Sequence, residues 1–189
     1  MAVSLLRPSA ARLRAIAAAA AHEELSVTVG STDGACPAGM ATNAAEGRVG
    51  DARDFAAAAA AVRDLAMFEL PWLAAAGAAP FAPGVGIAVS GRVLGVWWTN
   101  VCRVVRVVDE PDRQGFVYAT LRSHMMAGEE RFLVERRGDG THFRVLAHSR
   151  PVHPLARVGW QLVRRMQRRF AQQAVGAIAA AVARHRSRL

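Results

Sequence analysis

The residues best suited to chemistry lie in the second half of the chain, on or beside segments in which apolar and polar side chains alternate. They are one tyrosine, one histidine, two consecutive glutamates and a serine followed by an arginine: Tyr118, His124, Glu129, Glu130, Ser149 and Arg150. A histidine near a carboxylate is the minimum set for general acid–base catalysis. The same hydroxyl and carboxyl groups can instead orient a ligand inside an apolar pocket. These residue types therefore allow a catalytic site or a binding site.

Successive side chains of a β-strand point to opposite faces, so sequence parity predicts which residues share a pocket. Glu130 has the parity of Phe132, and this pair is expected to face inward. Ser149 has the parity of Phe143 and is expected at the mouth of the same pocket. The predicted ligand-binding residues, in chain order, are Tyr118, His124, Glu130, Phe132, Phe143, Ser149, Arg150 and Met166.

Each of these residues also has a purely structural interpretation. Tyr118 fits a half-buried aromatic residue of a sheet, and His124 fits a solvent-facing loop. Ser149 fits a residue that satisfies backbone groups where a strand ends. Burial raises the pKa of a carboxyl group unless a cation pairs with it. The candidate partners of Glu130 are Arg103, Arg106 and Arg150, and Arg150 could instead bind an anionic head group.

Alternating patterns and turn residues predict the strands that position this pocket. The expected strands cover residues 25–29, 85–89, 92–98, 102–108, 115–121, 130–136 and 141–147. Ser90–Gly91 has the signature of a two-residue hairpin turn, and residues 109–112 and 137–140 form further turns. The last six strands follow one another along the chain, which indicates an antiparallel meander.

Two short helical segments are predicted between the first strand and this meander. Asp51 is expected to cap a helix that contains Phe55, and a second helical piece covers residues 66–76. The glycine-rich stretch 31–50 and the stretch 77–83 are expected to be loops.

A long helix is predicted at the end of the chain. From Leu155 to Val182 apolar residues recur every three to four positions, which is typical of one buried stripe. Arginines lie on the opposite side of this helix, at Arg157, Arg164, Arg165 and Arg168.

The order of these elements predicts an α+β fold of the helix-grip type, with a curved seven-stranded antiparallel sheet wrapped around the C-terminal helix. A helix of about 28 residues is about 40 Å long, enough to span the concave face. A pocket is expected where the helix does not fill the concavity. We expect one domain over residues 25–189, preceded by an N-terminal extension over residues 1–24 that is rich in alanine and arginine and has no place in a core.

Three motifs in the strands carry a resemblance to a known family. They are Tyr118-x-Thr120-Leu121, Gly128-Glu129-Glu130-x-Phe132 and Ser149-Arg150-Pro151. With them, residues 25–175 resemble the uncharacterised family called domain of unknown function 1990, which bacteria and plants share. The resemblance implies the helix-grip fold of the START and birch-pollen-allergen-like superfamily, and it implies no particular reaction. The run 119–125 departs from the family's Gly-Thr-Leu-Pro-Gly-His-Pro pattern, so the resemblance does not fix the shape of that loop.

The composition excludes several classes of function. All 24 basic residues are arginine, which excludes Schiff-base chemistry and a Walker-type phosphate loop, because both need lysine. The net charge is +9, and residues 140–189 contain ten arginines and no acidic residue, so the last helix carries the basicity. Cys36 and Cys102 fit neither a metal site nor a disulfide framework, so we expect no metal, no cofactor and a cytoplasmic location.

The sequence commits to no reaction, and we expect a protein that binds an apolar small molecule or a lipid-like ligand. One alternative is an enzyme on the same scaffold that uses His124 with Glu129 or Glu130 as acid and base. Another is a protein-interaction domain with a filled core. The arginine face of the last helix fits a solvated surface first and an anionic membrane surface second. Nucleic acid is not favoured, because the arginines belong to no known docking motif.

Overall fold

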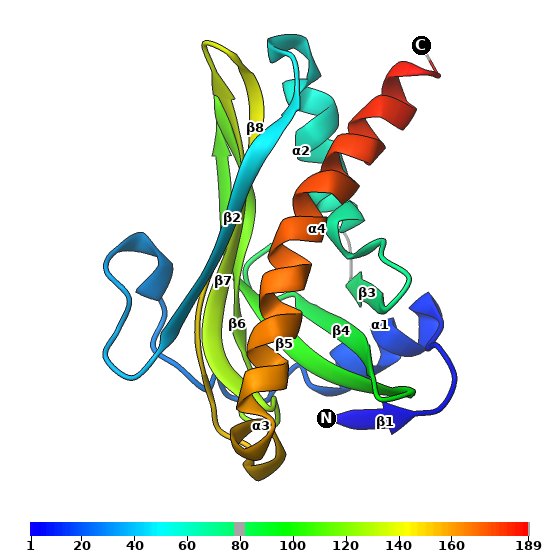
Figure 1. Ribbon diagram of the computed structural model, residues 1–189, viewed down its shortest axis with the longest axis vertical. Coiled ribbons are helices and arrows are strands. Elements are labelled where there is room, and N and C mark those ends of the chain that lie inside the picture. The colour runs from blue at the N-terminus through cyan, green and yellow to red at the C-terminus, as the bar shows by residue number, and fades with distance from the viewer. Residues whose placement is uncertain (78–81, 189) are drawn as a thin grey trace.

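A single curved antiparallel sheet dominates the computed structural model, which describes residues 1–77 and 82–188 (Figure 1). Its strand order is β2-β8-β7-β6-β5-β4-β3, so consecutive strands from β3 to β8 form a meander and β2 closes against β8. The strands are β2 (Ala41–Gly50), β3 (Leu73–Gly77), β4 (Gly86–Val93), β5 (Val96–Glu110), β6 (Arg113–Thr120), β7 (Met126–Arg137) and β8 (Gly140–Pro151). A short strand, β1 (Ala2–Ser4), pairs with the start of β5, before the point where β6 joins that strand.

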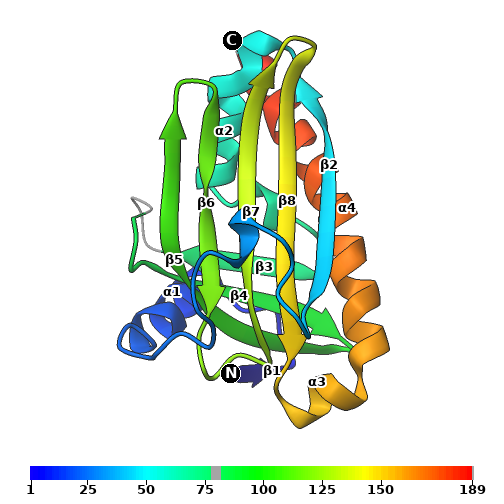
Figure 2. The ribbon, with the colours of Figure 1, turned by 90° about the vertical axis from the view of Figure 1, so that its left-hand side faces the viewer.

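The helices cover both faces of the sheet. The long helix α4 (Trp160–Arg186) lies along the concave face, with α2 (Phe55–Arg63) beside it (Figures 1 and 2). The other helices are α1 (Ala10–Ala19), α3 (Pro154–Val158) and three 3-10 turns, η1 (Ser31–Asp33), η2 (Ala52–Asp54) and η3 (Ala66–Phe68). The predicted α+β helix-grip fold, with a seven-stranded sheet around a long C-terminal helix, is confirmed.

The main core fills the concave face with aromatic rings. Phe132 is fully buried and lies 5.3 to 6.4 Å, ring centre to ring centre, from the rings of its neighbours. Those neighbours come from the sheet, from η3 and from α4: Phe116, Tyr118, Phe143, Phe68 and Phe170. The buried stripe of α4 consists of Phe170, Ala171, Ala174, Ile178 and Val182. This packing holds the C-terminal half of α4 against the sheet.

The first half of the predicted stripe is not buried, which corrects the sequence analysis. The helix is interrupted at Gly159, and Leu155, Val158 and Leu162 are 55%, 91% and 42% exposed. Glycine commonly ends a helix, and here it separates α3 from α4 at the lower end of the sheet (Figure 1). The apolar repeat in the sequence therefore begins before the part of the helix that the sheet covers.

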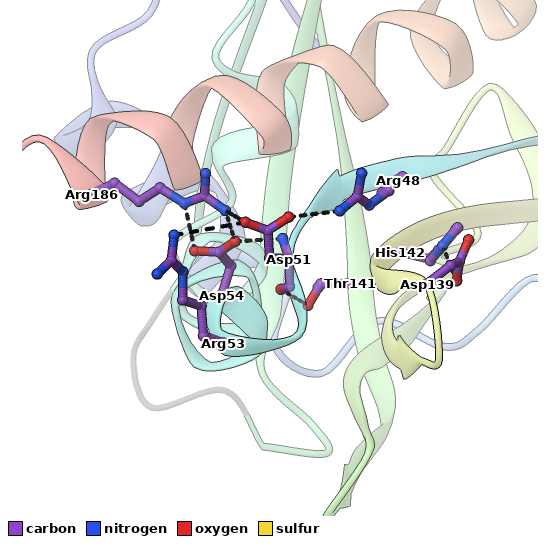
Figure 3. A network of polar contacts seen from close by, with 8 residues as sticks. All are labelled: Arg48, Asp51, Arg53, Asp54, Asp139, Thr141, His142 and Arg186. Atoms are coloured by element: carbon purple, nitrogen blue, oxygen red, sulfur yellow. Dashed lines mark hydrogen bonds and ion pairs between the residues drawn. The ribbon is translucent and has the colours of Figure 1, made fainter.

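The C-terminal end of α4 is fastened to the loop after β2 by an ion-pair network (Figure 3). Arg186 donates from Nε to Asp54 Oδ1 at 2.7 Å and from Nη2 to Asp51 Oδ2 at 2.8 Å. Arg48 donates to the other oxygen of Asp51 at 2.6 Å. Asp54 is buried, and its hydrogen bond with Arg186 lowers the pKa of its carboxyl group. Asp51 and Asp54 also form a capping box, which confirms Asp51 as the cap of the helical segment that leads into α2.

Two strand assignments near the start of the domain were wrong. Residues 25–29 form no strand and contribute only an isolated bridge between Leu25 and Leu121. The first strand of the seven-stranded path is β2, which lies inside the predicted loop 31–50. Its alanines and glycines have low strand propensity, but α4 packs closely on it, and a Cβ on Gly47 would lie 2.7 Å from Val175 Cγ1. The close packing of α4 on β2 explains why this strand consists of small residues, and these residues made it look like a loop in the sequence.

The β4–β5 hairpin and its neighbour β3 were also misplaced. The turn lies at Leu94–Gly95, both with positive φ as a type I′ turn requires, and not at Ser90–Gly91. The predicted strand 92–98 contains this turn and is divided between the end of β4 and the start of β5, whereas the predicted strand 102–108 lies within the single long strand β5. The predicted helix over 66–76 is the turn η3 followed by β3. The predicted loop 77–83 falls mainly on residues outside the described part of the chain. The turns at 109–112 and 137–140 are confirmed as hairpins.

The N-terminal helix packs on the convex face of the sheet. Leu13 is fully buried and Ala17 nearly so, against side chains of β3, β4 and β5 that include Ala88 and Trp97. Residues of the predicted extension 1–24 therefore belong to a second core, which the sequence analysis did not foresee. The helices of the described residues include none with the length and hydrophobicity of a membrane span.

Candidate functional site

A cavity of about 200 Å³ lies between the concave face and the N-terminal half of α4. Five of the eight predicted ligand-binding residues line it: Tyr118, His124, Glu130, Ser149 and Met166. The rest of the wall comes from the sheet, η3 and α4, and includes Asn43, Phe68, Trp72, Val89, Cys102, Met126, Gln167 and Phe170. Strands and helices distant in sequence therefore converge on one largely apolar space that contains several polar groups.

A tyrosine–glutamate pair is the main polar feature of this cavity. Tyr118 and Glu130 are cross-strand neighbours on β6 and β7, and the Tyr118 hydroxyl donates to Glu130 Oε2 at 2.5 Å. Burial raises the pKa of Glu130 to about 7, although the hydrogen bond from Tyr118 opposes the change. Burial, with the nearby Glu130 charge, raises the pKa of Tyr118 well above its ordinary value. Near neutral pH the carboxyl group is thus divided between its acid and its carboxylate forms.

None of the three predicted arginine partners reaches Glu130, which corrects the sequence analysis. Arg103 donates to three backbone carbonyls of residues 20–23, where α1 ends. Arg106 pairs with Asp33 at 2.5 Å. Arg150 is exposed at the end of β8 and does not line the cavity. Within the described part of the chain, Glu130 therefore has a hydroxyl partner and no cation.

His124 also lines the cavity, although a solvent-facing position was one interpretation of its loop. Its Nδ1 accepts a hydrogen bond from the Met126 backbone N–H at 2.8 Å. Burial lowers the pKa of His124 to about 4. The ring is therefore neutral at physiological pH, and because Nδ1 is an acceptor, Nε2 carries the proton.

Glu129 has a different role from its neighbour. Its carboxylate accepts from Gly30 N at 2.7 Å, from Thr32 N at 3.2 Å and from Thr32 Oγ1 at 2.5 Å. The backbone carbonyl of Ser31 contacts His148 Nδ1 at 2.8 Å. Glu129 thus anchors the loop around η1 to the sheet, and its carboxylate is occupied by three donors, which removes it from the acid–base set that the sequence analysis considered.

A hydrogen-bonded group joins α4 to the sheet at the cavity wall. Gln167 Nε2 donates to Ser149 Oγ at 2.9 Å, and Asn43 Nδ2 donates to the Gln167 carbonyl oxygen at 2.8 Å. Sequence reasoning missed Asn43 and Gln167. The neighbour of Gln167, Met166, was predicted, so the position of Gln167 on the helix was a usable signal. No such signal pointed to Asn43, because the strand that contains it was not predicted.

Two predicted aromatic residues lie behind the cavity and do not line it. Phe132 and Phe143 are fully buried, and their rings lie 6.4 Å apart in the packed core. They support the wall through Tyr118 and Phe170, whose rings are within 5.4 and 6.3 Å of Phe132. Their predicted role in shaping the pocket is therefore indirect, and they do not form its surface.

A family model matches residues 26–177, and its description is domain of unknown function (DUF1990). Among curated relatives, a UPF0548 protein from Deinococcus radiodurans is 44% identical over 82 residues, which are 43% of this chain and 41% of that protein. The matched segments span between 41% and 60% of the length of the curated relatives.

Solved structures with low sequence identity share the fold. TTHA0849 from Thermus thermophilus has a TM-score of 0.60 at 12% identity, covering 77% of this chain and 99% of its own. The di-domain ARO/CYC protein BexL, from the BE-7585A biosynthetic pathway, has a TM-score of 0.57 at 15% identity, covering 77% of this chain and 51% of its own. At this identity the likeness concerns architecture alone.

Proposed function

We propose that this chain, which belongs to the domain of unknown function family DUF1990, binds a small, largely apolar molecule in the cavity between the sheet and α4. The Tyr118–Glu130 pair is the observation that carries the proposal. A carboxyl group held in an apolar space without a cation is costly to bury, and such exceptions to ordinary packing concentrate at functional sites.

The size of the cavity limits the ligand. Pockets for drug-sized molecules measure about 300 to 1,000 Å³, whereas this cavity measures about 200 Å³. An apolar cavity of about 150 Å³ in another protein holds benzene. The proposed ligand, or the part of it that enters the cavity, is therefore the size of one ring or a short chain, and the cavity is too small for a whole lipid.

The polar groups of the cavity select one hydrogen-bonding group on that ligand. Glu130 accepts from a hydroxyl or an amine in its ionised form and donates to a carbonyl or an ether in its protonated form. Because its pKa is about 7, both forms are available near neutral pH. His124 and Ser149, which line the same cavity, offer further polar contacts to the ligand. Apolar contact would come from side chains such as Phe170 and Met166.

An acid–base enzyme on the same scaffold is the second candidate, because His124 and Glu130 line one cavity. With a pKa of about 7, Glu130 would supply and recover a proton. The neutral His124 would donate a hydrogen bond from Nε2. Glu130→Gln distinguishes the two functions, since it removes proton transfer and keeps a hydrogen-bonding group of nearly the same shape.

A protein-interaction domain with a filled core is the third candidate, and the cavity argues against it. The two free thiols, Cys36 and Cys102, support the proposed cytoplasmic location.

Ligand binding is tested with protein purified from its own host and examined by native mass spectrometry for a bound small molecule. Calorimetry with toluene, phenol and benzylamine then measures binding of one-ring probes with no polar group, a hydroxyl or an amine. Ala147→Phe places a ring in the cavity wall and should abolish binding, whereas Ala56→Phe, on an exposed position of α2, should leave it unchanged. Equal binding by both variants, or no binding of any probe together with no copurified molecule, would exclude this site.

A further inference from the structure

Exposed apolar side chains gather at one end of the molecule. Among the described residues, eight of the ten exposed large apolar side chains come from β1 and the residue before it, the segment after β1, the β4–β5 turn, α3 and the start of α4. We call this set the apolar end: Met1, Val3, Leu5, Leu6, Leu94, Leu155, Val158 and Leu162. β1 and α3 lie at the same end of the sheet in both views (Figures 1 and 2).

Strand register and hydrogen bonds bring these segments together. In the β1–β5 pair Ser4 lies opposite Trp97, so the residues after β1 run toward the turn that carries Leu94. On the other side, Asn100 Oδ1 accepts from Met125 N at 3.2 Å. The Met125 carbonyl in turn accepts from the backbone N–H groups of residues 152 and 153, which lead into α3. These contacts link the segments of the apolar end to one another through β5 and Met125.

Leu94 has two features that are unusual for a leucine, namely high exposure and a positive φ. It is 91% exposed, and its φ of 49° lies in the left-handed region that side chains other than glycine, asparagine and aspartate rarely adopt. Asparagine or glycine would make this hairpin turn more stable. A leucine at such a position, together with Leu5 and Leu6 at 78% and 79% exposure, indicates a surface that contacts an apolar phase.

The charges around the apolar end are uniformly positive where α3 and α4 begin. Residues after Asp139 include no acidic side chain. Arg150, Arg157, Arg165 and Arg168 are exposed, and none of the ion pairs of the described residues includes them. At the opposite end of α4, by contrast, Arg184 and Arg186 pair with carboxylates. Arginines left without acidic partners beside exposed apolar side chains form the pattern of a basic amphipathic surface.

We propose that the apolar end docks on an anionic lipid bilayer. The exposed leucines and valines enter the interfacial layer, and the unpaired arginines contact the phosphate groups of the lipids. His124 and Met126, which line the cavity, flank Met125 at this end, so docking places the membrane next to the cavity wall. The inference does not depend on which molecule the cavity binds.

Vesicle flotation tests this inference with the full chain. Vesicles of phosphatidylcholine alone are compared with vesicles in which one third of the lipid is phosphatidylglycerol. The native protein should float with the anionic vesicles and much less with the neutral ones. Replacing both Leu94 and Val158 by serine should weaken partition about tenfold or more. Replacing Arg157 and Arg165 by glutamine should weaken it about fivefold for each arginine.

Matched controls come from other faces of the molecule. Val29 and Val107 are the two exposed large apolar residues outside the apolar end, and their double replacement by serine should leave partition unchanged. Arg53→Gln with Arg63→Gln is the charge control. Thermal unfolding of every variant checks that each is folded. The inference is overturned if the native protein ignores anionic vesicles, or if the test and control variants float alike. It is also overturned if ultracentrifugation shows that the apolar end joins two copies of the chain, because the surface is then covered by protein.

Discussion

Replacing Glu130 by glutamine is expected to make the protein more stable above neutral pH, because it removes a buried charge. Tyr118 is its hydrogen-bond partner, and no cation among the described residues balances the carboxylate. Glutamine keeps the shape and an oxygen that accepts from Tyr118, but it is neutral at every pH. The substitution therefore isolates the cost of ionising this group inside the cavity.

The size and the sign of the effect follow from the pKa of Glu130, which burial raises from 4.5 to about 7. Below about pH 4.5 the group is protonated in the folded and the unfolded chain, so the native protein bears no cost. As the pH rises toward 7, the unfolded chain loses this proton first, and the native protein loses stability. Above 7 the cost is complete, roughly 2 to 3 kcal/mol once partial exposure of the carboxylate to the cavity is allowed for.

Urea unfolding of both proteins between about pH 4 and about pH 8.5 measures this difference. The two free energies of unfolding should agree at the acid end and separate as the pH rises, with the glutamine variant the more stable. Glu129→Gln is the matched control on the adjacent residue, and its expected sign is opposite. Its carboxylate accepts three hydrogen bonds, so an amide there should destabilise the protein by about 1 to 3 kcal/mol.

Two results would refute this reasoning. If the glutamine variant and the native protein have equal stability at the alkaline end, the carboxylate is well solvated or balanced by a cation. If the glutamine variant is less stable above neutral pH, the ionised form makes native contacts that stabilise it. Tyr118→Phe separates these cases, because loss of its hydrogen bond should raise the pKa of Glu130 further.

Three further substitutions test the fold. Arg186→Met removes the partner of the buried Asp54 and should lower the free energy of unfolding measured in urea at neutral pH. Because the pKa of Asp54 is lowered, that loss should vanish as the pH falls below about 4. Leu13→Ala should cost about 2 to 4 kcal/mol in the same assay if α1 is part of the core. Gly128→Ala should lower the midpoint of thermal unfolding sharply, since its Cβ would lie 2.4 Å from the His148 carbonyl oxygen.

The sequence predicted the meander and the grip of the last helix because both depend on local patterns. Alternation defined the strands around residues 115–121 and 130–136, and turn residues at 109–112 and 137–140 marked their ends. The strand β2 was not predicted, because its sequence shows no alternation of apolar and polar residues. Its small residues reflect close contact with α4, for example at Gly47. The point at which the last helix leaves the sheet was not predicted either, because an apolar repeat does not show where the sheet that covers it ends.

The candidate site was predicted only in part, because local patterns show which face a side chain is on but not what it contacts. Parity correctly put Tyr118 and Glu130 on the same face, and both line the cavity. Parity cannot distinguish a wall from the layer behind it, so Phe132 and Phe143 were expected to line a space that they only support. Contacts between distant segments, such as that of Asn43 with Gln167, depend on the folded chain and gave no local signal.

The pairing of β2 with β8 has a consequence for biosynthesis. Ala41 lies opposite Ser149, so nearly the whole domain must leave the ribosome before β2 acquires its neighbour. Until then its backbone hydrogen-bonding groups stay open to other chains, the situation that favours aggregation of nascent proteins. The alanines and glycines of β2 expose little apolar surface before β8 has been synthesised. Assembly of the complete sheet is expected to be a late event in synthesis.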